Sequence, residues 1–110
     1  MAQKAETVFK ERVLPLLKQL PRSWVIKIQQ VAKRGTPDIL LCVAGVFVAI
    51  ELKTDTGVLD KLQRYNLEQI ARCGGIAIVL TPSNLVATLD FLHEIAEKAR
   101  AYSKEHEVIQ

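Results

Sequence analysis

Residues 35–53 read GTPDILLCVAGVFVAIELK, and the centre of the predicted sheet follows from this segment. It contains two apolar runs rich in β-branched residues, separated by Ala44-Gly45. That is the spacing of a β-hairpin with a two-residue turn, in which Val43 pairs with Val46. Because side chains alternate along a strand, one face of the hairpin is wholly apolar. We expect that face to lie on the core, and its residues are Ile39, Leu41, Val43, Val46, Val48, Ile50 and Leu52.

The other face of the hairpin brings three charged side chains together. Counting outward from the turn places Asp38 opposite Glu51, and Lys53 follows two residues later on the same face. Directly opposed residues have Cβ atoms roughly 5 Å apart, so two carboxylates there are destabilising unless something neutralises them. A divalent cation would do so. The alternative is a plain Glu51–Lys53 salt bridge with Asp38 as a turn residue, which leaves two opposed acids among apolar strands unexplained.

Length and composition predict one soluble domain over residues 1–110, with 49% apolar residues. The first twelve residues, MAQKAETVFKER, lack the apolar core of a secretory signal, and no apolar run approaches the length of a membrane span. We therefore expect a cytoplasmic protein, which works in a reducing cytoplasm or nucleoid. The two cysteines, Cys42 and Cys73, have no disulfide or zinc spacing, and we expect both to be reduced thiols in the core.

Positive charge is concentrated at the N-terminal end of the chain. Residues 1–36 carry eight Lys and Arg against two Glu, a net charge of +6, whereas the remainder carries −3. A basic segment leading into the acidic pair suits a polyanionic partner, because phosphate contacts supply most non-specific affinity for nucleic acid. A solvated helix face is the alternative reading. We predict that Lys27, Lys33 and Arg34 contact DNA.

Further elements are predicted on both sides of the hairpin. Residues 5–20 have the period of an amphipathic helix, which Pro15 should kink or divide. Residues 23–31 alternate as a strand, with Trp24, Ile26 and Ile28 on one side and Val25, Lys27 and Gln29 on the other. The apolar stripe predicted for the first helix consists of Phe9, Val13, Leu16, Leu17 and Leu20.

The C-terminal half adds a helix, a strand and a second helix. A helix over about residues 59–73 ends at Gly74-Gly75. Residues 76–80 form a strand so uniformly apolar that we expect burial on both faces and parallel pairing. The last helix opens at Thr81-Pro82-Ser83, with Leu85, Leu89, Leu92, Ile95 and Ala99 facing inward. The order α-β-β-β-α-β-α predicts an α/β fold.

The charged triplet resembles the signature of the PD-(D/E)xK nuclease superfamily, with PD at residues 37–38 and ELK at 51–53. An ordered set of segments is similar, more specifically, to the virus-type replication-repair nuclease (VRR-NUC) branch: GTPDI, FVAIE, LQRYN and the glycine pair at 74–75. The resemblance implies a restriction-endonuclease-like αβββαβ core, a mixed sheet flanked by helices. It also implies that Asp38, Glu51 and the main-chain carbonyl of Leu52 bind Mg²⁺ or Mn²⁺ while Lys53 is catalytic.

Two more site residues follow from the resemblance. Glu6 matches an acidic metal ligand of the first helix, and its spacing to Phe9 and Val13 places it along the apolar stripe. The alternative is an exposed first-turn acid favoured by the helix dipole. Gln63 matches a helix glutamine that supports the active site, and the alternative is a solvent-facing residue. His93 and His106 are isolated, so a zinc site or a histidine nucleophile is not expected.

These features predict a metal-dependent DNA endonuclease selective for DNA structure. Stand-alone members of this size resemble Holliday-junction resolvases, which implies a homodimer and products with 5′-phosphate and 3′-hydroxyl ends. A flap or nicking repair nuclease is the second enzyme reading. The third interpretation is a catalytically silent DNA-binding subunit, although that interpretation gives no reason for two acids to lie opposite each other. No glycine-rich phosphate loop is present, so no nucleotide cofactor is expected.

Overall fold

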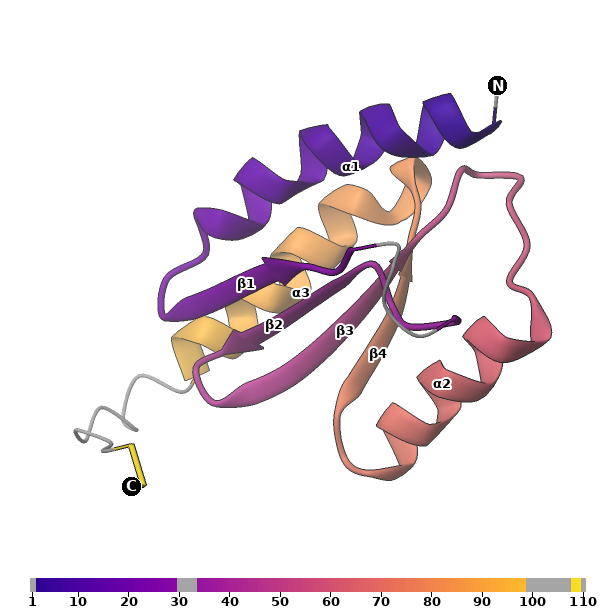
Figure 1. Cartoon of the computed structure of the whole chain (residues 1–110). Helices are drawn as coiled ribbons and strands as arrows, with labels where there is room; N and C mark the ends of the chain where they lie inside the picture. Colours follow the sequence, from indigo (N-terminus) through magenta and orange to yellow (C-terminus); the bar gives the residue numbers. More distant parts are fainter. Residues whose placement is uncertain (1, 30–33, 99–107, 110) are drawn as a thin grey trace.

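A computed structural model of the chain describes residues 2–29, 34–98 and 108–109 (Figure 1). The elements follow one another in the predicted order. They are helix α1 (Ala2–Lys18), strands β1 (Ser23–Lys27), β2 (Ile39–Val43) and β3 (Val46–Leu52), helix α2 (Lys61–Arg72), strand β4 (Ile76–Leu80), the 3₁₀ turn η1 (Pro82–Asn84) and helix α3 (Leu85–Lys98). No helix among these residues is long and apolar enough to cross a membrane.

The four strands form one mixed sheet in the order β1-β2-β3-β4. Strands β1, β2 and β3 are antiparallel, and β4 runs parallel to β3 after the crossover through α2. The predicted hairpin register is confirmed, from Val43 opposite Val46 outward to Ile39 opposite Ile50. Ala44 and Gly45 both have positive φ, 48° and 88°. A two-residue hairpin turn of type I′ requires that conformation at both positions.

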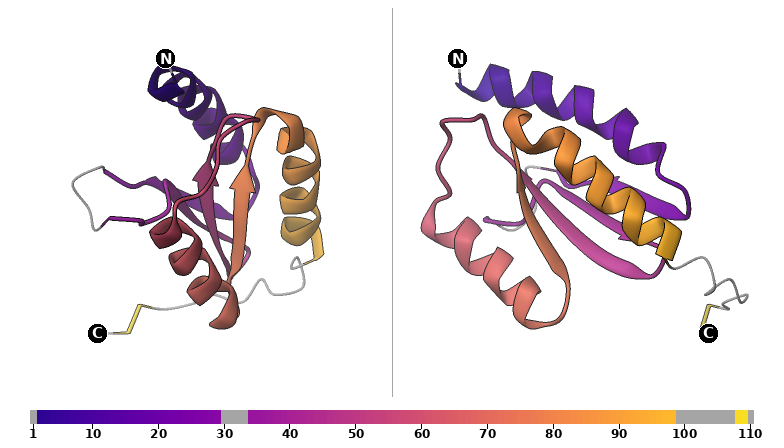
Figure 2. Two further views of the ribbon diagram at one scale, coloured as in Figure 1. Left: turned by 90° about the vertical axis from the view of Figure 1, so that its right-hand side faces the viewer. Right: turned by 180° about the vertical axis from the view of Figure 1, so that it is seen from behind.

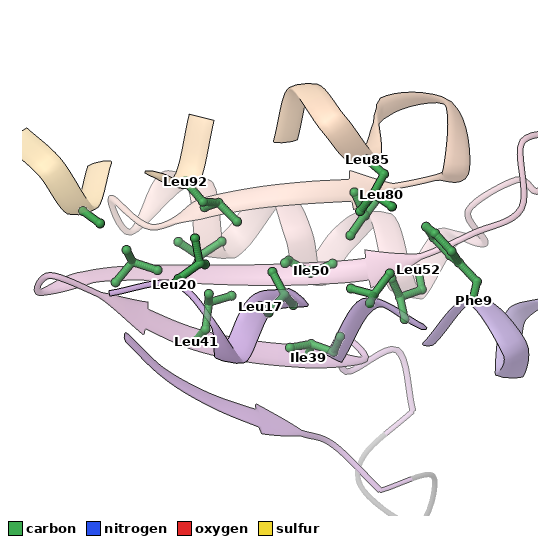
Figure 3. Packing of buried hydrophobic residues seen from close by; sticks show 14 residues of the cluster. Phe9, Leu17, Leu20, Ile39, Leu41, Ile50, Leu52, Leu80, Leu85 and Leu92 are labelled. Carbon is green, nitrogen blue, oxygen red and sulfur yellow. The ribbon is translucent and has the colours of Figure 1, made fainter. Parts of the chain in front are cut away.

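Helices cover the two faces of the sheet unequally. Helices α1 and α3 pack on one face, and α2 packs on the other, over β3 and β4 (Figure 2). The core lies between the sheet and helices α1 and α3, where the predicted apolar face of the hairpin is buried except for Val46, which is partly buried (Figure 3). Its fully buried large side chains are Leu17, Ile39, Leu41, Ile50, Leu52, Leu80, Leu92, Val13, Val43 and Val48. The α/β fold with a mixed sheet flanked by helices is therefore confirmed.

Helix α1 differs from its prediction at Pro15, which does not divide it. The proline lies near the C-terminal end of the helix with its ring exposed, so few helical residues follow the lost backbone hydrogen bond. Beyond it the chain tightens into i→i+3 bonds, from Gln19 N to the Leu16 carbonyl and from Leu20 N to the Leu17 carbonyl. The predicted apolar stripe faces the core, with Leu16 only partly buried.

Strand β1 is shorter than predicted, and its exposed side was not foreseen. It ends at Lys27, and residues 30–33 lie outside the described part of the chain. Val25 packs on the core, whereas Trp24 is 63% exposed and Ile26 40% exposed. Trp24 and Ile26 are exposed because α2 lies over β3 and β4 only. The same face of β1 has no helix over it (Figure 2).

Two other expectations are corrected. Cys42 and Cys73 are free thiols, but both are exposed instead of buried in the core. Cys42 lies opposite Trp24 on the uncovered face of the sheet, and Cys73 caps the exposed end of α2. Strand β4 is half-buried over most of its length because it lies at an edge of the sheet. Ala99 of the last predicted helix lies outside the described residues.

Candidate metal centre

A pocket of about 480 Å³ opens where α1, the end of β3 and the start of α2 meet. Its lining is almost entirely polar or charged. The residues are Glu6, Thr7, Lys10, Asp38, Glu51, Leu52, Lys53 and Gln63. Every metal ligand and catalytic residue predicted from the sequence is therefore at one place, brought there by three elements far apart in the chain.

Asp38 is held from two sides. Its carbonyl accepts a hydrogen bond from Ile28 N at 2.8 Å, which continues the pairing of β1 with β2. Its Oδ2 accepts from the backbone N–H of Leu52 at 2.8 Å, so the side chain reaches across to β3. The loop before it approaches α2 closely, because a Cβ on Gly35 would lie 2.6 Å from Leu62 Cγ. Gly35 also has φ +79°, and both facts require glycine there.

Glu51 is the buried acid of the site, with 3% of its surface exposed. Gln63 Nε2 donates to its Oε2 at 2.9 Å. The other oxygen, Oε1, is buried and finds no hydrogen-bond partner among the described residues. Burial raises the pKa of Glu51 from 4.5 to about 8, and the neighbouring carboxylate of Asp38 contributes through repulsion and through a hydrogen bond with the protonated Glu51, with Lys53 opposing the rise. Without a bound cation the carboxyl group therefore carries a proton near neutral pH.

Gln63 has a geometric reason to face Glu51. It is the third residue of α2, and its Oε1 accepts from Asp60 N at 3.0 Å while Asp60 Oδ1 accepts from Gln63 N at 2.8 Å. This reciprocal pair is a capping box at the helix N-terminus. Because the cap uses the amide oxygen, the amide nitrogen is left to donate to Glu51.

Two lysines neutralise the remaining carboxylates. Lys53 Nζ lies 3.9 Å from Glu6 Oε1, and Lys10 Nζ lies 3.6 Å from Asp38 Oδ1. Both lysine side chains are largely buried, at 13% and 16% exposed. Gly57 lies against the stem of Lys53, where an added Cβ would be 3.2 Å from Cδ. The turn after β3 thus packs on the methylene chain of this lysine.

The donor set suits a hard divalent cation, although the ligands are not gathered around one point. Within residues 2–29, 34–98 and 108–109, no three acidic, histidine or cysteine side chains converge as a closed site. Each carboxylate instead faces its own donor: Glu6 faces Lys53, Asp38 faces Lys10 and Leu52 N, and Glu51 faces Gln63. Carboxylate oxygens are the ligands that Mg²⁺ and Mn²⁺ prefer, and the Glu51 oxygen that accepts no hydrogen bond from the described residues is available as such a ligand.

The predicted DNA contacts are not part of this pocket. Lys27 and Arg34 are exposed but line none of it, and Lys33 lies outside the described residues. Conversely, the sequence reading missed Lys10 and Thr7. Lys10 stands four residues after Glu6 on α1, one helical turn along the same face, and that spacing is the signal in the sequence that points to it. No protein-family model, curated protein or solved structure matches this chain.

Proposed function

We propose that the protein is a metal-dependent, structure-selective DNA endonuclease of the PD-(D/E)xK superfamily, similar to the VRR-NUC branch and to Holliday-junction resolvases. One observation carries the proposal. Two acids and a lysine that a hairpin places side by side share a polar pocket, and the buried acid has an oxygen that accepts no hydrogen bond from the described residues. A purely structural sheet gains nothing from a buried carboxyl whose pKa is raised to about 8.

Asp38, Glu51 and the main-chain carbonyl of Leu52 would hold Mg²⁺ or Mn²⁺, with Glu6 as a further ligand from α1. The cation supplies a polarised phosphate and a bound water of lowered pKa. Gln63 orients Glu51 through the 2.9 Å hydrogen bond to Oε2, which leaves Oε1 available as a ligand. Glu6 would bind the cation in place of Lys53, and the ammonium of Lys53 would then be released.

Lys53 then acts on the reacting groups. It directly follows β3, two residues after Glu51, and its stem packs against Gly57. It can orient or deprotonate the attacking water, or neutralise charge that develops on the phosphate. Attack of water on phosphorus with release of the 3′ oxygen leaves 5′-phosphate and 3′-hydroxyl ends.

The wider surface would bind the DNA backbone. The N-terminal third of the chain carries +6, and Lys27, Lys33 and Arg34 are its proposed contacts near the hairpin. A four-way junction has approximate two-fold symmetry, and each chain has one Asp38/Glu51/Lys53 site. Paired incision therefore calls for a homodimer with two-fold symmetry.

The test is a cleavage assay with labelled four-way, flap and linear duplex DNA in Mg²⁺, Mn²⁺ or EDTA. We expect metal-dependent cutting of the four-way junction in preference to linear duplex. Preference for the flap would replace the resolvase assignment with the repair-nuclease reading. Binding of DNA without cutting of any substrate would overturn the enzyme proposal in favour of a DNA-binding subunit.

A further inference from the structure

Lys10 extends into the site from α1, and its ammonium group faces Asp38. Its Nζ lies 3.6 Å from Asp38 Oδ1, its side chain is 16% exposed, and it lines the pocket beside Glu6. A lysine in an ordinary surface ion pair is far more exposed. Such a pair contributes little, because holding the long side chain in one geometry costs rotamer freedom. This one is enclosed next to a carboxylate that the proposed function assigns to a metal.

A divalent cation bound to Asp38 would compete with Lys10 for the charge of that carboxylate. Mg²⁺ binds carboxylate oxygens at about 2.0–2.1 Å and would repel an ammonium that lies 3.6 Å from the same carboxylate. The flexible four-carbon stem of Lys10 allows the ammonium to move away while its backbone stays on the helix. The pocket, of about 480 Å³, has room for the displaced group and for a phosphate.

The net charge of the pocket with a bound divalent cation indicates that the released ammonium of Lys10 can bind a phosphate. Three carboxylates (Glu6, Asp38, Glu51) and two lysines (Lys10, Lys53) sum to −1 when all are ionised, and one divalent cation changes this to +1. The loaded pocket is then complementary to a single phosphodiester, which carries −1. Removing either lysine would make the loaded pocket neutral and abolish that complementarity.

We propose that Lys10 is a metal-gated phosphate-binding residue: it pairs with Asp38 in the metal-free protein, and cation binding releases it to a non-bridging oxygen of the DNA phosphate. This inference rests on the proposed function. It makes the site bind DNA tightly only when the cation is present, since the same ammonium is engaged by Asp38 otherwise.

The first arm of the test is a calorimetric Mn²⁺ titration without DNA. The proteins are wild type, Lys10→Gln, and the control Arg12→Gln, which removes one charge from an exposed position of the same helix. Loss of the competing ammonium should tighten Mn²⁺ binding by about two- to fivefold in Lys10→Gln, the size of a partly exposed ion pair. Arg12→Gln should match wild type.

The second arm measures affinity for a labelled four-way junction in EDTA and in Ca²⁺, with the DNA checked to remain uncut. In Ca²⁺, Lys10→Gln should bind about tenfold more weakly than wild type, as loss of a hydrogen bond to a charged group predicts. In EDTA the loss should be no larger than that of Arg12→Gln. Lys10→Arg keeps the charge and should restore most of the affinity in Ca²⁺.

The outcomes separate this inference from the proposed function. Wild-type protein that binds no Mn²⁺ would overturn both. Wild-type protein that binds Mn²⁺ and cuts DNA, with Lys10→Gln indistinguishable from Arg12→Gln in both arms, would overturn only the role of Lys10. An equal loss of DNA affinity in EDTA and in Ca²⁺ would overturn the gating, because it makes Lys10 an ordinary backbone contact.

Discussion

Glu51 is the residue at which folding and the proposed chemistry conflict. An ionised carboxylate that is 3% exposed and lies beside Asp38 is costly, and the protein responds by raising its pKa to about 8. The unfolded chain releases that proton near pH 4.5, so between these values the folded state holds one more proton. The stabilisation that comes from retaining this proton is therefore complete below about pH 4.5. It decreases as the pH rises and is lost once the pH has passed through 8. A bound cation would remove the conflict.

This conflict predicts the pH dependence of a Glu51→Gln variant. In EDTA, the variant should gain stability relative to wild type as pH rises from 5 to 8, by roughly 1.4 kcal/mol per pH unit at most. Glutamine is neutral at every pH and can still accept the hydrogen bond from Gln63. Urea unfolding at pH 5, 7 and 9 measures the difference, with exposed Glu68→Gln as the control. Parallel stability curves for wild type and Glu51→Gln would contradict the account.

Lys53 should be needed for turnover and not for metal binding. Lys53→Ala removes the ammonium that acts on water or phosphate, and we expect a rate loss of at least about a hundredfold. Mn²⁺ affinity should stay level or increase, because Glu6 loses the partner that lies 3.9 Å away. Calorimetry and single-turnover cleavage separate these effects, with Lys98→Ala as an exposed control. If Mn²⁺ affinity falls together with the rate, Lys53 has a structural role instead.

At the scale of elements, the hairpin was the most predictable part of the molecule. Period-two alternation and the Ala44-Gly45 turn determine its register, and the register alone brings Asp38 to Glu51. The sequence placed Glu6 of α1 at that pair but did not single out Lys10. The four-residue spacing puts Lys10 on the same helix face as Glu6, but its contact with Asp38 depends on the crossing angle and the depth of packing, which only the structure shows.

The capping box of α2 allows stability and activity to be separated. Asp60→Ala removes the cap side chain, and Gln63→Ala removes both the reciprocal cap bond and the hydrogen bond to Glu51. Each should destabilise the fold by about 1 kcal/mol. Only Gln63→Ala should also lower the cleavage rate, by about tenfold or more, as expected for a residue that orients a metal ligand. Thermal unfolding and cleavage assays compare the two, and equal rate losses would refute a separate role for Gln63.

At the scale of the whole molecule, the sequence predicted the layers better than the surfaces. Element order and the apolar stripes suffice for a mixed sheet with helices on both faces. They do not reveal that α2 stops short of β1, which leaves Trp24 and Cys42 exposed. Nor do they show how far the apolar stripes of α1 and α3 are buried in the core, which leaves neither stripe free for a dimer interface.

The proposed homodimer makes a prediction about products. Light scattering on the purified protein should give twice the mass of the 12.3 kDa chain. On a cruciform plasmid, two coordinated cuts across the junction should convert the supercoiled form directly to linear DNA. Independent nicks would give relaxed circles first. A monomer that only relaxes the plasmid would contradict paired incision.

Single-turnover cleavage of a labelled four-way junction in Mg²⁺ tests the central claim most directly, that Asp38 and Glu51 hold the cation that cuts DNA. Asp38→Asn keeps an oxygen for the Leu52 N–H, and Glu51→Gln keeps the bond from Gln63, so both variants should fold and bind DNA. Exposed Asp90→Asn and Glu68→Gln are the matched controls. We predict wild-type rates for the controls and a loss of at least about a hundredfold for Asp38→Asn and Glu51→Gln. Near-wild-type cutting by either of these two would contradict the account.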